Sequence, residues 1–452
     1  MSRNVTVAIV GGGSYGWVPT LTRDIMLSPG LEDVAFRLLD LNRTAAEETA
    51  ALGRRMADEW GFGATFIPTT SEAKALDGAD FVVVTISTGG FDAMQHDVHL
   101  PEKYGIYQTV GDSVGPGGWA RSLRNIPVFV HLAKQFQKYC PRAAILNYTN
   151  PMGTLTRTLS LCTDQPVVGL CHGLYEVYQT LTEIFRLKDE SEIRVNVAGL
   201  NHFFWVLDLR LRGKDGYAML RRRMRGRSLA EVLRESGDTS SVFYSHKLIA
   251  SELFEQYGVL PYGGDRHTAE FFSHYVAPDD SRLKKYRLVR TPVKWRRANA
   301  RKKRRRVLAL TSGKQPLDKH RSREAAADII HTMTSGKDFI DVMNVPNRGQ
   351  VANLPEGAVV ETLGVINALG FTPLAAGPLP PNILPLVLPH ARNQELIVQA
   401  AMEGDRRKAF DALANEPLCS HLTLPRVRKL GEELMHKTRR WLPQFFSRRE
   451  RW

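Results

Sequence analysis

The fold is decided by Val5–Gly16, which reads VTVAIVGGGSYG. An apolar run typical of a buried strand leads directly into G-x-G-x-x-G, where a helical pattern begins. Glycines are needed at such a loop because the backbone must turn tightly and approach a pyrophosphate, which then lies at the helix N-terminus. The alternative is a glycine turn that only packs a helix on a sheet. We predict a dinucleotide-binding loop formed by Gly11, Gly13, Ser14, Tyr15 and Gly16.

An acidic residue follows the second apolar run. Asp40 comes directly after Val34–Leu39, at the distance from the loop where an acid accepts the ribose hydroxyls of NAD. Its carboxylate would repel a 2′-phosphate, so NAD is favoured over NADP, although Arg43 lies nearby. We add Asn42 to this predicted cofactor site.

Short apolar runs alternate with helical patterns over the first part of the chain, which predicts an α/β fold with a Rossmann-like, doubly wound parallel sheet. We expect this NAD-binding domain to span residues 1–195 and a second, mixed α/β and helix-rich domain to span 196–452. Pro373–Pro389 reads as an irregular connection. The expected strands are Val5–Val10, Val34–Leu39, Phe81–Ile86, Ala143–Leu146, Val167–Leu170, Ile193–Val197 and Phe203–Arg210, and the clearest helices are Thr44–Trp60 and Trp119–Tyr139.

The composition is that of a globular protein, with 43% hydrophobic and 24% charged residues. No apolar run approaches the ~18–20 residues of a membrane span, and the N-terminus carries no cleavage-site pattern. We therefore expect a cytoplasmic protein. Its cysteines show no paired spacing and are expected to be reduced thiols; they are Cys140, Cys162, Cys171 and Cys419.

The net charge of +14 is concentrated in two runs. Lys294–Arg306 carries nine basic residues and no acid, and Lys437–Trp452 carries six basic residues and one acid. Such runs are usually solvated faces or mobile segments, and no nucleic-acid-binding motif accompanies them. We therefore do not expect nucleic acid or membrane as a partner, and the role of both runs stays open.

Three groups of residues carry chemistry. Cys171-His172 and Asn201-His202 each follow a strand-like run, at strand ends where open α/β sheets bind ligands. A thiolate and an imidazole with open positions suit a catalytic metal, but Cys171 could equally be a buried apolar residue and His202 a core histidine. The third group, Gly264–His267 followed by Glu270, suits a general base beside an arginine that clamps an anion, or else a surface ion-pair network.

Taken in order, these motifs resemble glycoside hydrolase family 4. The match runs from Gly11 to about Cys419, and the stretch Asp97–Gln108 looks most like the α-galacturonidase branch of the family. The other matching motifs are Gly111–Gly118, Asn147–Met152, Cys171-His172, Asn201-His202, Gly264–His267, Asn347–Gln350 and Asn353–Pro355.

The resemblance implies an NAD- and metal-dependent α-glycosidase that does not use the ordinary pair of carboxylates. In this family NAD⁺ oxidises C3 of the sugar, the C2 proton becomes acidic, and the group on C1 leaves by elimination. Water then adds, and NADH returns the hydride, so no net oxidation occurs. The family also leads us to expect Mn²⁺ and a homodimer or homotetramer.

Roles are carried over by matching motifs. Cys171 and His202 match the metal ligands, Asp265 matches the base that removes the C2 proton in α-specific members, and His172 matches the residue that assists the leaving group. Asn150 matches a substrate-contacting asparagine. We place three further residues at the substrate: Asp112, Arg266 and His267.

Two features bear on the sugar. The segment 87–96 lacks the arginine with which phosphosugar branches grip a C6 phosphate, and Asp92 would oppose a phosphate. Gly173 follows the Cys-His pair, and Cys-His-Gly resembles the α-glucuronidase branch of the family. The absence of a side chain at Gly173 would leave space and less negative charge near an anionic C6 group. We therefore expect an α-glucuronide or an α-galacturonide as substrate. Sulfoquinovosides and neutral α-glucosides or α-galactosides are alternatives, and a sugar or hydroxy-acid dehydrogenase is a more distant one.

Overall fold

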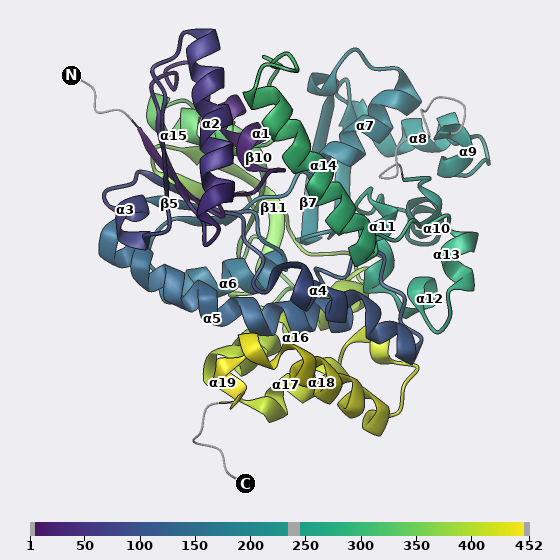
Figure 1. The fold of residues 1–452 in the computed structure, drawn as a ribbon. Helices are drawn as coiled ribbons and strands as arrows, with labels where there is room; N and C mark the ends of the chain where they lie inside the picture. Colours follow the sequence, from purple (N-terminus) through teal and green to yellow (C-terminus); the bar gives the residue numbers. More distant parts are fainter. Residues whose placement is uncertain (1–4, 234–244, 447–452) are drawn as a thin grey trace.

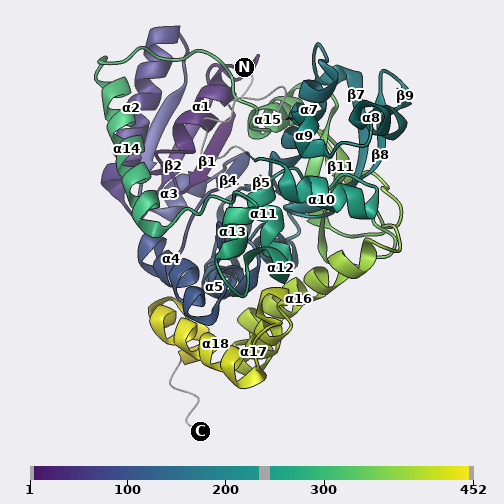
Figure 2. The ribbon, with the colours of Figure 1, turned by 90° about the vertical axis from the view of Figure 1, so that its right-hand side faces the viewer.

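The computed structural model describes residues 5–233 and 245–446, which form one twelve-stranded sheet between layers of helices (Figure 1). The strand order is β3-β2-β1-β4-β5-β6-β10-β11-β7-β8-β9, and β12 pairs with β11. Alternate residues of β1 face opposite layers: Ile9 packs with α1, α2 and α15, whereas Val10 packs with α5 and α6. The C-terminal helices gather at one end of the molecule (Figures 1 and 2).

The first six strands are parallel, in the order 3-2-1-4-5-6 of dinucleotide-binding folds, which confirms the predicted fold class. β3 was not expected from the sequence because it contains Pro68; it lies at the edge of the sheet, where proline is tolerated. The strands are β1 (Thr6–Val10), β2 (Ala35–Leu39), β3 (Thr65–Thr69), β4 (Phe81–Val84), β5 (Ala144–Asn147) and β6 (Val167–Gly169). Their helices are α1 (Val18–Met26), α2 (Arg43–Trp60), α3 (Glu72–Leu76), α4 (Gly90–His99), α5 (Gly115–Tyr139), α6 (Met152–Cys162) and α7 (Gly173–Phe185).

The later strands extend this sheet in antiparallel fashion, beginning where β10 pairs with β6. They are β7 (Ile193–Leu200), β8 (Phe203–Leu211), β9 (Lys214–Asp215), β10 (Phe339–Pro346), β11 (Val359–Asn367) and β12 (Gly370–Pro373). The division of the chain at residue 195 stays a prediction, since the sheet is continuous across it. The helices here are α8 (Gly216–Met224), α9 (Leu229–Leu233), α10 (Leu248–Tyr257), α11 (Asp265–Thr268), α12 (Ser273–Val276), α13 (Ser281–Lys285), α14 (Val293–Thr311), α15 (Ala326–Ser335), α16 (Leu384–Glu403), α17 (Arg406–Ala414), α18 (Leu424–Thr438) and α19 (Pro443–Phe446).

The prediction that Pro373–Pro389 is irregular is wrong for its last residues. α16 begins at Leu384, with a proline in its first turn, where a backbone N–H has no partner inside the helix. Pro389 lies further inside α16.

The first basic run is part of a helix, and its residues 301–306 are exposed, as expected of a solvated face. Residues 294–306 lie in α14, which packs against α2 and buries Val307 (Figure 2). The second run begins at the end of α18 and continues through α19. Its residues 447–452 lie outside the described part of the chain. In the ranges that the structure describes, no helix is long and apolar enough to cross a bilayer.

Candidate active site

The glycine loop joins β1 to α1. Gly11 has a φ of +101°, and a Cβ there would lie 2.1 Å from the carbonyl oxygen of Thr85, directly after β4. A Cβ on Gly13 would lie 2.6 Å from that of Ala45 in α2. Because neither position has space for a side chain, only glycine lets the loop pass between β4 and α2.

The other predicted cofactor residues lie around this loop. The carboxylate of Asp40 accepts the N–H groups of Gly13 and Asn42, each at 2.8 Å, and can accept further bonds because each oxygen has two lone pairs. Asn42 caps α2 through its side chain. Ser14 closes the turn, and Tyr15 donates to Glu48 of α2 at 2.7 Å.

A cavity of about 400 Å³ lies beyond the loop, and it gathers all the predicted metal, catalytic and substrate residues. Its walls come from the carboxyl ends of the parallel strands, from the β7–β8 hairpin and from the helices after residue 245. The predicted residues among its lining are Asp112, Asn150, Cys171, His172, His202, Asp265, Arg266 and His267.

His202 lies at the tip of the β7–β8 hairpin. It is the second residue of the two-residue turn between β7 and β8, with a φ of +63°, a backbone region that non-glycine residues rarely adopt. Its Nδ1 is 3.0 Å from the hydroxyl of Ser113, which leaves Nε2 for another partner. Burial lowers the pKa of His202 well below its usual value, so the imidazole is neutral, as a metal ligand must be.

Cys171 lines the same cavity, at the end of β6. Burial and the nearby carboxyl of Glu361 raise the pKa of its thiol, so a metal ion would have to displace the proton. Asn201 donates to Glu361 at 3.1 Å, while its own buried Oδ1 has no hydrogen-bond partner among the described residues. Within those residues no group of three or more His, Cys, Asp and Glu side chains is placed to hold a metal. Cys171 and His202 both line the cavity, and their role as metal ligands stays a prediction.

Asp265 is buried at the start of α11 and also caps α10. Its carboxylate accepts the N–H groups of Ile249 at 3.3 Å and Ala250 at 3.0 Å. Burial raises the pKa of Asp265, and the neighbouring Lys247 acts in the opposite direction. A raised pKa suits a general base that works near neutral pH.

His172 faces Glu324, with Nδ1 at 3.3 Å from Oε1. Hydrogen bonding to Glu324 raises the pKa of His172 against the opposing effect of burial. A protonated imidazole beside the Cys171 end of the cavity can donate a proton to a leaving group.

Asp112 and its neighbours build another part of the cavity wall. Burial would raise the pKa of Asp112, but the interaction with His267 and the positive charges of Arg121 and Arg296 outweigh it and lower the value. Burial lowers the pKa of His267 to about 4, and its ring lies 3.9 Å from that of His202, centroid to centroid. The Nδ1 of His267 has no hydrogen-bond partner in the described part of the chain, so it is available to a ligand.

Glu270 organises the loop that carries Asp112. Its Oε1 accepts the N–H groups of Val110 at 2.6 Å and Gly111 at 3.0 Å, and the hydroxyl of Thr109 at 2.9 Å. Its role is to hold this loop, and it is not among the residues that line the cavity.

The space expected beside Gly173 is filled. A Cβ at this position would lie 2.3 Å from Cε2 of Tyr262, whose ring also packs 5.5 Å from that of His202. Gly173 therefore makes room for the ring of Tyr262 and not for a substrate group. Glu176, one helical turn further along α7, also lines the cavity, so negative charge is not absent from this wall.

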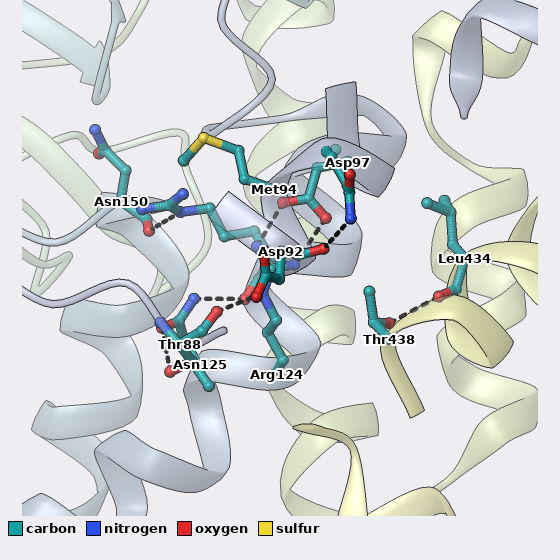
Figure 3. A network of polar contacts seen from close by, with 12 residues as sticks. Thr88, Asp92, Met94, Asp97, Arg124, Asn125, Asn150, Leu434 and Thr438 are labelled. Atoms are coloured by element: carbon teal, nitrogen blue, oxygen red, sulfur yellow. Dashed lines mark hydrogen bonds and ion pairs between the residues drawn. The ribbon is translucent and has the colours of Figure 1, made fainter. Parts of the chain in front are cut away.

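The segment 87–96 is not among the residues that line this cavity. It forms a turn and α4, which a buried network ties to α5 (Figure 3). Arg124 forms a two-pronged ion pair with Asp97 and donates to the carbonyl oxygen of Thr88 at 2.9 Å. The exposed carboxylate of Asp92 is paired with Arg297 of α14 at 2.7 Å.

Some cavity residues were not expected from the sequence. Ser113 orients His202, and Trp295 and Arg296 line the cavity from the first turns of α14. The last two lie inside the basic run, which was expected to be a solvated face because it is so rich in charged residues. Tyr262 stands three residues before Asp265, and its aromatic side chain beside the acidic cluster was the available signal.

Comparison with known proteins shows the family of this chain. The model of the family 4 glycosyl hydrolases matches residues 6–187, and that of the family's C-terminal domain matches 197–419. An α-galacturonidase of Thermoanaerobacterium saccharolyticum is 33% identical over 97% of both chains. The crystal structure of the Bacillus subtilis protein lplD superposes with a TM-score of 0.87 at 32% identity, over 95% of this chain and 99% of that one. A 6-phospho-α-glucosidase from gut microorganisms, solved with NAD and Mn²⁺, shares the fold with a TM-score of 0.80 at 20% identity, over 98% and 99% of the two chains. The glycine loop, the cavity and the two family models together make this chain a member of the family 4 glycosyl hydrolases.

Proposed function

We propose that this chain hydrolyses α-galacturonides, using NAD as a recycled reagent and a divalent metal ion, with Mn²⁺ the expected one. The observation that carries the choice of sugar is the 33% identity with an α-galacturonidase over 97% of both chains. Arg266 and Arg296 line the cavity and provide positive charge for a C6 carboxylate. Arg266 donates to Val289 and Thr291, which fixes its guanidinium.

The residues of the cavity suit each part of the reaction. NAD would take the hydride from C3 and return it, and the metal at Cys171 and His202 would polarise the sugar oxygens. Asp265 removes the C2 proton, because its carboxylate is buried and its pKa is raised. His172, paired with Glu324, gives a proton to the leaving oxygen. Asn150 has a buried Oδ1 without a hydrogen-bond partner among the described residues, and this oxygen can accept a hydrogen bond from a sugar hydroxyl.

A substrate panel tests the proposal. Aryl α-galacturonide, α-glucuronide, α-galactoside, α-glucoside and α-sulfoquinovoside are compared with NAD⁺, Mn²⁺ and a reductant, and kcat/KM is measured for each. We expect the galacturonide to be the best substrate, with no stoichiometric rise in NADH absorbance. Faster turnover of a neutral glycoside would overturn the choice of sugar. NADH released in proportion to substrate would instead indicate a dehydrogenase.

A further inference from the structure

α14 brings a lysine from the second half of the chain to the glycine loop. A Cβ placed on Gly16 would lie 2.7 Å from Nζ of Lys303 and 3.3 Å from its Cδ. The space beside Gly16, the last glycine of the G-x-G-x-x-G motif, is thus filled by the end of an exposed lysine side chain.

A second contact fixes α14 against the same loop. Arg304, next to Lys303, forms a two-pronged ion pair with Glu48 of α2, at 2.6 and 2.8 Å. Glu48 also accepts the hydroxyl of Tyr15, a loop residue, at 2.7 Å. Burial and this bond to Glu48 raise the pKa of Tyr15 to about 12, so the hydroxyl stays a donor over the working range of pH. The position of Lys303 therefore depends on a chain of contacts that runs from α14 through α2 to the loop.

We propose that Lys303 is a ligand of the cofactor's pyrophosphate, supplied by the second half of the chain. The inference rests on the proposed use of NAD. In a dinucleotide-binding fold the pyrophosphate lies over the glycine loop at the N-terminus of the first helix, and a lysine ammonium binds phosphate as a compact charge with three donors. The carboxylate of Asp40 adjoins the loop through Gly13 and disfavours a 2′-phosphate there, so the pyrophosphate is the expected partner of Lys303.

Binding measurements test this without turnover. The dissociation constants of NAD⁺ and ADP-ribose, which both carry the pyrophosphate, are measured by calorimetry at two salt concentrations. Lys303→Gln should raise both dissociation constants about tenfold, which is the lower end of the range expected for losing a charge-assisted hydrogen bond. It should also reduce the salt dependence of binding. Lys303→Arg keeps the positive charge and should restore most of the affinity.

Lys302→Gln is the matched control, because it removes the same charge from the exposed neighbour on α14. It should leave both dissociation constants within about twofold of the wild type, a change below the ~1.4 kcal/mol of a tenfold effect. Equal losses of affinity in the two variants would mean that the overall positive charge of α14 attracts the cofactor, and would overturn the assignment. Unchanged binding in Lys303→Gln would also overturn it, while leaving the proposed function intact. A wild-type protein that hydrolyses the substrate without binding NAD⁺ would overturn both.

Discussion

At the scale of single residues, Asp265 combines a chemical and a structural role, since its carboxylate lines the cavity and also caps α10. Asp265→Asn keeps one oxygen as an acceptor for the cap but cannot remove a proton. We expect kcat to fall by ~10²–10⁴-fold, the usual contribution of a general base, together with loss of deuterium exchange at C2 of the sugar. NMR of the substrate in D₂O measures that exchange.

Asp215→Asn is the control for this substitution, because Asp215 also caps a helix, accepting the N–H of Ala218 at 3.0 Å, and does not line the cavity. It should leave exchange unchanged. Undiminished exchange in Asp265→Asn would show that another group is the base.

Gly173 offers a second test at this scale. Gly173→Ala places a methyl group 2.3 Å from the ring of Tyr262 and should lower the free energy of unfolding by ~1–3 kcal/mol, as overpacking does. Urea denaturation of the single variants and of the double variant with Tyr262→Leu measures the coupling. Gly173→Ala should lower the free energy of unfolding much less in the Tyr262→Leu background, where the ring is absent. A full cost in the double variant would mean that the clash is with another group.

At the scale of elements, Glu416 joins the end of α17 to α16. It is buried, accepts from Asn393 at 3.2 Å and lies 4.0 Å from His390. Burial raises the pKa of Glu416 from 4.5 to about 7. Between these two pH values Glu416 holds more of its proton in the folded state than in the unfolded state, so its contribution to stability falls as the pH rises.

Glu416→Gln removes this titration. We expect the variant to be more stable than the wild type at pH 8, by at most about 3 kcal/mol, and to show a flatter stability profile between about pH 4.5 and 7. Denaturation at a series of pH values checks this. Glu403→Gln, an exposed residue of α16, should leave the profile unchanged. A Glu416→Gln profile with the same slope as the wild type through this window would contradict the assignment.

At the scale of the whole molecule, the two halves share a hydrophobic core. Ile9 and Leu21 from the first half pack in one cluster with Ile329, Met343 and Ile366 from the second. A fragment of residues 1–195 would expose this surface, so we expect it not to fold alone, whereas the full chain unfolds in one transition. Circular dichroism of the fragment, alone and mixed with residues 196–452, provides the measurement. A stable, NAD-binding fragment would show that the first half is independent.

The sequence by itself determined the parallel half of the sheet, because strand periodicity and the glycine loop at Gly11–Gly16 are local signals. It also indicated eight of the twenty residues that line the cavity, through motifs such as Cys171-His172, although periodicity alone left their roles open. β3 was hidden because Pro68 is unfavourable in a strand until an edge position removes the need for its N–H.

Only the tertiary structure decided how distant segments meet. The pairing of β10 with β6 extends the sheet, and the packing of α14 on α2 brings Trp295, Arg296 and Lys303 to the cavity and the loop. The sequence could not show that Gly173 leaves space for the ring of Tyr262, because that contact joins residues far apart in the chain. Such contacts depend on burial and on the geometry of long-range packing, which no local pattern encodes.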